Sequence, residues 1–235
     1  QTLGINARPV PQVRLALPEY WTLPIFNHWV QLKGHIAFGK FTDENWQHDF
    51  TQRKSKYSEG VLYHSKAGYL RIGNDAAFCP LSVELGLEMA AQFDGKPYTY
   101  DGNGGLKCKV AEGGLKGMWH AFIPGGHDDG EGQYANIAGN QLGSWLMRIN
   151  YNADTWKLGV YADHYFEDDS QMFLLDYNGY GEGKEWQSKK SRRYFMYSLK
   201  DMMLGAELNI KYGRWLRNIV LEYIHTKYQS GPYNH

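Results

Sequence analysis

Residues 82–93 read Ser82-Val-Glu-Leu-Gly-Leu-Glu-Met-Ala-Ala-Gln-Phe93, and their side chains alternate between apolar and polar or small. A period of two predicts a β-strand with one apolar face and one polar face. At about 3.3 Å per residue such a strand is roughly 40 Å long, or about 30 Å along a membrane normal once it is tilted. That length crosses the hydrocarbon layer of a bilayer. The pattern therefore predicts a transmembrane β-strand, with lipid on one side and water on the other.

The same alternation recurs along the chain, which predicts an all-β fold: an antiparallel transmembrane β-barrel with about eight strands in this sequence. Pro18 is expected to end the first strand, because proline cannot donate to a ladder. A short helix is expected at 115–122. The expected strands cover about 12–17, 30–41, 63–73, 82–93, 137–151, 156–166, 204–212 and 215–223.

The connections between these strands alternate between short and long. Short turns are expected at 18–27, 74–81, 152–155 and 213–214. Long, polar, extracellular loops are expected near 42–60, 94–136 and 167–197. Outer-membrane barrels have this arrangement, with short periplasmic turns at one end and long loops at the other. Cys79 and Cys108 then lie at opposite ends of the strands, too far apart for a disulfide.

Composition narrows the possible functions. The formal net charge is zero, which gives no reason to expect nucleic acid as a partner. The chain has no apolar run of about 18 residues, so no membrane-spanning helix is expected. No signal peptide begins at Gln1. Aromatic residues of the apolar parity flank the short turns, as in an interfacial belt: Tyr151, Trp156, Tyr212 and Trp215.

The opposite parity carries charge of both signs. We expect these side chains to pair across neighbouring strands as a polar lumen wall, with a path or docking surface for a polar solute as the alternative. The wall residues are Lys33, Arg71, Glu84, Glu88, Arg148, Lys157, Asp163, Glu207 and Lys211.

The long loops carry aromatic side chains beside Asp, Asn and Gln. A flat ring can stack on a sugar face while polar neighbours bind its hydroxyls, although such rings can equally pack the loops together. The glycan-binding candidates are Trp119, Tyr134, Tyr177, Tyr180 and Trp186.

Acidic loop residues raise two further possibilities. His127-Asp128-Asp129 and Asp163-His164 offer ligand types for calcium, and paired carboxylates occur in glycoside hydrolases. The chain has no recognised metal-binding spacing, and solvated loop charge is the simpler account. We expect no catalytic residue, no metal and no cofactor.

Three segments resemble the capsule-assembly (Wzi-type) outer-membrane proteins in their Bacteroides-like form. They are Val30-Gln-Leu-Lys-Gly-His-Ile-Ala-Phe-Gly-Lys-Phe41, Gly86-Leu-Glu-Met-Ala-Ala-Gln-Phe93 and Val220-Leu-Glu-Tyr-Ile-His-Thr-Lys-Tyr-Gln-Ser-Gly-Pro232. The resemblance runs from about Pro9 to His235. It implies a monomeric barrel of about eighteen strands that acts as a lectin for capsular polysaccharide. Because such proteins are roughly twice this long, residues 1–235 are expected to be an incomplete barrel segment.

The sequence thus predicts a non-enzymatic outer-membrane protein that binds or assembles surface polysaccharide through its extracellular loops. Its expected partners are that polysaccharide and outer-membrane lipid. Two alternatives stay open: a porin-like channel for polar solutes, and a soluble β-rich glycan-binding module or hydrolase.

Overall fold

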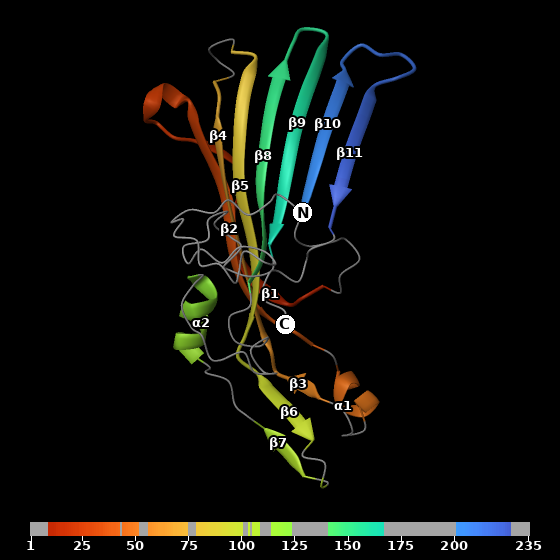
Figure 1. Ribbon diagram of the computed structural model, residues 1–235. Coiled ribbons are helices and arrows are strands. Elements are labelled where there is room, and N and C mark those ends of the chain that lie inside the picture. Colours follow the sequence, from red (N-terminus) through yellow and green to blue (C-terminus); the bar gives the residue numbers. More distant parts are fainter. Residues whose placement is uncertain are drawn as a thin grey trace, which may run out of the picture.

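The protein is dominated by one antiparallel sheet of eight strands, in the order β1-β2-β4-β5-β8-β9-β10-β11 (Figure 1). The computed structural model describes residues 9–42, 44–51, 56–74, 79–100, 103, 105–108, 114–123, 141–166 and 201–226. The strands of the main sheet are β1 (Gln12–Thr22), β2 (Val30–Lys40), β4 (Leu62–Ile72), β5 (Leu81–Phe93), β8 (Gln141–Asn152), β9 (Trp156–Phe166), β10 (Met202–Ile210) and β11 (Asn218–His225).

Strand pairing keeps the predicted parity across the whole sheet. Leu85 pairs with Leu70 on one side and with Met147 on the other, and Glu84 pairs with Arg71 and Arg148. The sheet therefore has an apolar face, on the side of Leu85 and Val160, and a polar face, on the side of Glu84. Leu85 is 44% exposed and Val160 is 49% exposed, so no second layer covers the apolar face at these positions.

The all-β prediction is confirmed. In the part of the chain that the structure describes, β1 and β11 form the two edges of the sheet, and they are not paired with each other. No described helix is both long and apolar enough to cross a membrane.

Short and long connections lie at opposite ends of the strands, as the sequence predicts (Figure 1). The short-turn end holds 73–74, 79–80, 153–155, 211–217 and 23–29, with the 3₁₀ turn η1 (Phe26–His28). The long-loop end holds α1 (Trp46–Thr51), β3 (Tyr57–Glu59), β6 (Lys96–Tyr100), β7 (Leu106–Cys108) and α2 (Gly114–Phe122). The loops expected at 42–60 and 94–136 thus contain secondary structure, and of these elements only α2 was predicted. The loop expected at 167–197 lies outside the described residues.

A second, three-stranded sheet (β3-β6-β7) continues the β4–β5 hairpin beyond a kink. The main ladder ends where Leu62 pairs with Phe93 and resumes where Glu59 pairs with Lys96. The residues between these pairs include Gly60 (φ 69°), Asp94 (φ 56°) and Gly95 (φ 109°). Positive φ angles bend both chains at the same level, and glycine adopts them with little strain. The Asp94-Gly95 dipeptide is the sequence signal that could have indicated a bend at this position.

Proline 18 does not end the first strand, contrary to the sequence-based expectation. β1 continues to Thr22, with an irregularity between Leu17, which pairs with Gly34, and Trp21, which pairs with Leu32. Proline is tolerated on an edge strand and at a bulge because its missing N–H has no partner to satisfy there.

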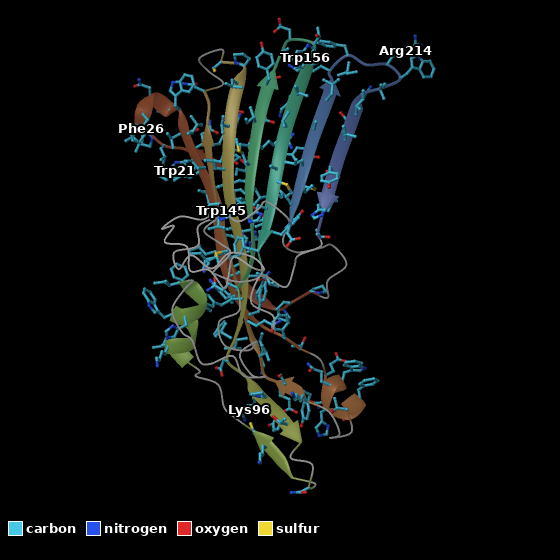
Figure 2. All side chains as sticks on the ribbon, in the orientation of Figure 1. Trp21, Phe26, Lys96, Trp145, Trp156 and Arg214 are labelled. Atoms are coloured by element: carbon cyan, nitrogen blue, oxygen red, sulfur yellow. The ribbon has the colours of Figure 1, made fainter. Side chains whose placement is uncertain are left out.

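The large apolar side chains differ in exposure between the two ends of the sheet. At the short-turn end they are exposed (Figure 2), and the belt residues Tyr151 and Trp156 have ring centroids 5.4 Å apart. At the long-loop end the apolar face is buried in two small clusters, one around Met89 and Phe166 and the other around Ala91, Phe93 and Ala121. Cys79 and Cys108 are free thiols, Cys79 in the short connection before β5 and Cys108 on β7.

Glycines on the polar face make room for large neighbours, and this packing predicts a stability difference. A Cβ on Gly205 would overlap the Tyr161 ring, whereas a Cβ on Gly68, on the apolar face, would have no atom within 4 Å. We expect Gly205→Ala to lower the free energy of unfolding by about 1–3 kcal/mol through overpacking, and Gly68→Ala to cause no loss. Urea unfolding in detergent, followed by circular dichroism, measures both. Equal midpoints for the two variants would contradict this packing.

Candidate functional site

The polar face carries one row of paired side chains that crosses the sheet at a single level. Strand register places Gln31, Arg71, Glu84, Arg148, Tyr161, Gly205 and Glu222 side by side from β2 to β11. Charges of opposite sign therefore alternate in the middle of the row. Cross-strand pairs of this kind stabilise a sheet, and three residues of the predicted lumen wall, Arg71, Glu84 and Arg148, belong to the row.

Glu84 is the centre of the first half of this row. Its carboxylate accepts hydrogen bonds from the Tyr20 hydroxyl and the Asn150 side-chain amide, each at 3.1 Å. Arg71 lies 3.9 Å from the same carboxylate, and its guanidinium also donates to the Gln31 side chain. Four strands thus converge on one carboxylate, which fixes its position and neutralises its charge.

Arg148 has the corresponding role in the second half. Its guanidinium donates to Glu207 at 2.6 Å and to Asn150 at 2.8 Å, and it lies 5.3 Å from the Tyr161 ring centroid. The Tyr161 hydroxyl in turn donates to Glu222 at 2.6 Å. The Arg148–Glu207 bond joins β8 to β10 and the Tyr161–Glu222 bond joins β9 to β11, so each of these two passes over an intervening strand.

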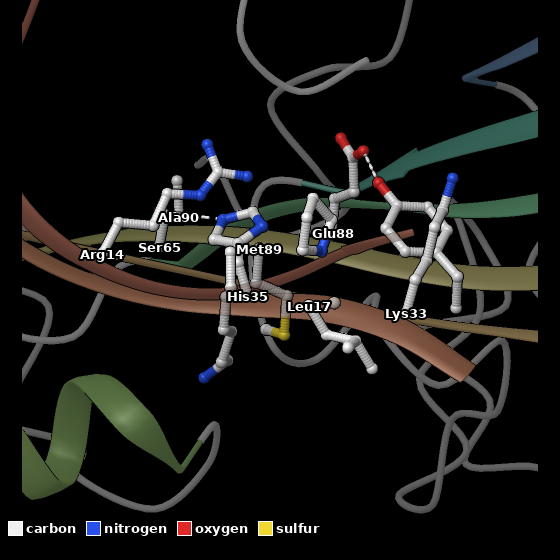
Figure 3. Close-up of a pocket in the computed structure, with 13 residues that line it drawn as sticks. Arg14, Leu17, Lys33, His35, Ser65, Glu88, Met89 and Ala90 are labelled. Carbon is white, nitrogen blue, oxygen red and sulfur yellow. Dashed lines mark hydrogen bonds between the residues drawn. The ribbon is translucent and has the colours of Figure 1, made fainter. Parts of the chain in front are cut away.

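A cavity of about 300 Å³ opens on the sheet near β1 (Figure 3). Arg14, His35, Glu88 and Lys33 project from the polar face, while Leu17 and Met89 project from the apolar one. The His35 ring lies 3.2 Å from the Ser65 hydroxyl, and the Tyr69 hydroxyl donates to Glu88. Lys66 lines the cavity as well. The cavity therefore presents three cations, an imidazole and one carboxylate, a combination that suits a polar or anionic solute.

Lys33 is held against aromatic rings beside this cavity. Its ammonium lies 4.6 Å from the ring centroids of Tyr20 and Tyr69. A cation over the face of a ring is attracted by the ring's quadrupole. Lys33 is therefore positioned by its neighbours and still lines the cavity.

The remaining predicted wall residues lie nearer the ends of the strands. Asp163 is buried on β9, whereas Lys157 is exposed beside the 153–155 turn. Lys211 follows β10 and donates to the Ala153 carbonyl at 2.6 Å. The structure therefore brings Arg71, Glu84, Arg148 and Glu207 into one network, and it places Lys157 and Lys211 at the short-turn end.

Only one of the predicted glycan-binding aromatic residues falls within the described residues. Trp119 is 61% exposed on α2, with its ring centroid 6.2 Å from that of Phe122. Tyr134, Tyr177, Tyr180 and Trp186 lie outside the described residues, as does the possible calcium segment at 127–129. Among the residues that are described, no three acidic, histidine or cysteine side chains come together as a metal site.

Sequence reasoning missed a pair of exposed rings at the long-loop end. Trp46 and Phe50 stack on α1 with centroids 4.9 Å apart and an interplanar angle of 12°, and they are 61% and 72% exposed. The Trp-x-x-x-Phe spacing places both on one helix face, and this signal is present in the sequence. His48 bonds to Asp49 at 2.9 Å beside them.

Further ring contacts connect α1 to the three-stranded sheet. The His48 ring lies edge-on to Tyr57, which stacks on its cross-strand partner Tyr98 at 4.8 Å. Burial and the nearby Glu59 carboxylate raise the pKa of Tyr98 above its usual value. The long-loop end thus combines flat rings with polar groups.

Comparison of the chain with protein-family models, with curated proteins and with solved structures gave no match.

The network around Arg148 predicts that two alanine substitutions lower the free energy of unfolding by different amounts. Arg148→Ala removes the bonds to Glu207 and Asn150 and the contact with Tyr161. Because the Arg148 and Glu207 side chains are about one-third exposed, we expect a loss of about 1–2 kcal/mol in the free energy of unfolding, between the values for exposed and buried pairs.

The matched control for Arg148→Ala is Lys157→Ala, which we expect to change stability by less than about 0.5 kcal/mol. Urea unfolding of both variants measures the difference. A loss no larger for Arg148→Ala than for Lys157→Ala would show that the network contributes little.

Proposed function

We propose that this chain forms the wall of a monomeric outer-membrane β-barrel whose long-loop end binds surface or capsular polysaccharide, without catalysing a reaction. The observation that carries the proposal is the uncovered apolar face of the eight-stranded sheet. In water, a contiguous apolar surface that extends over eight strands is unfavourable and marks an interaction site. Lipid as the contacting phase removes that cost.

Most of the exposed apolar residues of the main sheet share one parity, whereas Leu142, Val220 and Ile224 lie on the other. Those of the shared parity come from every strand of the main sheet, from β1 to β11. The set on this face includes Val13, Leu15, Leu32, Ile36, Ile72, Leu85, Met147, Ile149, Val160, Leu204, Ile219 and Leu221. A soluble sandwich would cover such a face with a second sheet.

Three further features support a barrel in the outer membrane. Charged side chains of the polar face are hydrogen-bonded across strands, among them Glu84, Arg148 and Glu222, as a wall beside a water-filled lumen needs. Exposed aromatic residues gather at the short-turn end, where a belt at headgroup depth is expected. β1 and β11 are long edge strands, and closing a barrel abolishes such edges.

A charge placed in the middle of the apolar face tests the lipid contact. Val160 lies four residues from the start of β9, about 13 Å along the strand. At the usual tilt this is roughly 10 Å along the membrane normal, in the middle part of an apolar band about 25 Å tall. We expect Val160→Arg to cost about 2–4 kcal/mol in vesicles. At a half-exposed site in water, the same change would cost less than about 0.5 kcal/mol.

Tyr212→Arg is the control for Val160→Arg, because Tyr212 is exposed in the turn at the expected headgroup level. Its expected cost is about 0–1 kcal/mol. Urea unfolding from lipid vesicles reads out both variants. If Val160→Arg were as mild as Tyr212→Arg, and the protein stayed dispersed without detergent, the soluble alternative would replace the barrel.

Polysaccharide binding is proposed for the aromatic platform of α1, with Tyr134, Tyr177, Tyr180 and Trp186 as further candidates. Trp46 and Phe50 offer adjacent, nearly parallel rings to solvent, and the His48–Asp49 pair lies beside them. The apolar C–H face of a pyranose can lie on such rings while its hydroxyls bond to the polar neighbours. Many weak sites of this kind suit a repeating polymer.

Replacing one ring of the α1 platform should weaken glycan retention. At about 1 kcal/mol for a stacking contact, Trp46→Ala is expected to lower the affinity for a capsular glycan about fivefold. Phe26→Ala is the control, because Phe26 is exposed at the opposite, short-turn end (Figure 2). A glycan array probed with both variants gives the comparison. Equal retention would remove the platform from the proposal.

A second candidate function is a channel for polar solutes, and the cavity lined by Arg14, Lys33, His35 and Glu88 favours it. Conductance in planar bilayers separates the two functions. Steady open pores favour the channel, whereas a silent bilayer together with glycan retention favours the polysaccharide-binding protein.

A further inference from the structure

The apolar face of the sheet ceases to be apolar near the long-loop end. His64 and Lys66 on β4, and Gln141 on β8, all belong to the parity that elsewhere carries Leu and Val. Exposed to hydrocarbon, a lysine and an amide at these positions would be costly. Something other than lipid must therefore cover them.

Helix α2 covers all three side chains. Lys66 donates from Nζ to the carbonyls of Ala121 and Phe122, and Gln141 donates from Nε2 to those of His120 and Ala121. These carbonyls belong to the last turn of α2, whose carbonyl groups have no partner within the helix. His64 is 1% exposed, stacks on Phe38 and lies 5.8 Å from the Phe122 ring. The polar side chains on this face and the terminal carbonyl groups of α2 thus satisfy each other's hydrogen-bonding capacity.

The contact between α2 and the sheet is also apolar. Ala121 is fully buried with Ala91 and Phe93, and Met118, Phe38 and Leu62 pack against this cluster. α2 therefore lies directly on the face that we propose to contact lipid, beside the lipid and not above the lumen.

The opposite side of α2 is apolar as well, and it is exposed. Leu115 and Trp119 are 85% and 61% exposed, Ile123 continues the same stripe, and Phe122 lies at its border with the sheet-facing side. The spacing i, i+4, i+7 and i+8 places these four side chains on one side of the helix. A soluble surface helix normally turns such a stripe inward.

The height of α2 matches the edge of a bilayer. Lys66 and His64 lie six and eight residues from the end of β4 at Ile72, about 20–26 Å along the strand. At the usual tilt this is roughly 15–20 Å along the membrane normal, in the outer part of an apolar band about 25 Å tall. A tryptophan on a short amphipathic helix is favoured at that depth.

We propose that α2 is a membrane-interface anchor, with the Leu115–Trp119–Phe122–Ile123 stripe seated in the outer boundary of the bilayer. This inference rests on the proposed barrel wall. It assigns Trp119 to lipid contact, and so removes it from the glycan-binding candidates. The helix replaces lipid over the polar part of the wall and restores an apolar surface outside it.

Site-specific quenching in vesicles tests this placement. In a Cys79→Ser/Cys108→Ser background, single cysteines at Leu115, Trp119, Leu85 and Lys107 are labelled with an environment-sensitive fluorophore in the reconstituted full-length protein. Nitroxide lipids carry the quencher either near the headgroup or deep in the acyl chain. Lys107, exposed on β7, is the water-facing control.

We expect the labels at Leu115 and Trp119 to lose fluorescence mainly with the shallow quencher, the label at Leu85 to lose it with the deep quencher, and the label at Lys107 to keep it. Quenching at Leu85 without quenching at Leu115 and Trp119 would overturn the anchor and leave the wall standing. An unquenched label at Leu85 would overturn the wall, and with it the anchor, whatever the labels on α2 do.

Discussion

Each strand of the main sheet points alternate side chains to opposite faces, and eight strands paired in register turn that local rule into two surfaces of opposite chemistry. A slip of one residue in any strand would move its apolar set to the polar face. The network around Glu84 and Arg148 opposes such a slip, because it fixes the level of β1, β2, β4, β5, β8 and β10 relative to one another. The uncovered apolar face therefore depends on polar bonds made on the other side of the sheet.

Strand parity, the two sets of connections and the expected helix near 115–122 could be predicted from the sequence, because period-two alternation is a local signal. Leu85 on one face and Glu84 on the other are readable from residues 82–93 alone. Which carboxylate meets which guanidinium was not readable in this way. The Arg148–Glu207 bond spans an intervening strand, and it depends on register and on the absence of a side chain at Gly159.

The second sheet and the α1 platform were missed for a different reason. β3 and β6 are short, and their pairing joins segments that the sequence presents as two separate polar loops. The prediction that Pro18 ends the first strand was wrong. The effect of a proline depends on whether its strand lies at an edge, and edge position is a property of the whole sheet. His64 and Lys66 interrupt the apolar parity of β4, and their partners on α2 lie more than fifty residues away in the sequence.

The kink at Gly60 and Asp94-Gly95 has a mechanical consequence. It joins the α1 and Tyr57–Tyr98 region to β4 and β5 through continuous backbone, so under the proposed function a pull on the bound polymer would run along the strands. Because β4 and β5 are then pulled the same way, the force loads the hydrogen bonds of the β2–β4 and β5–β8 ladders together, in shear, instead of opening them one at a time. Attachment through this hairpin would resist drag on the surface polymer better than attachment through a loop that peels away from one end.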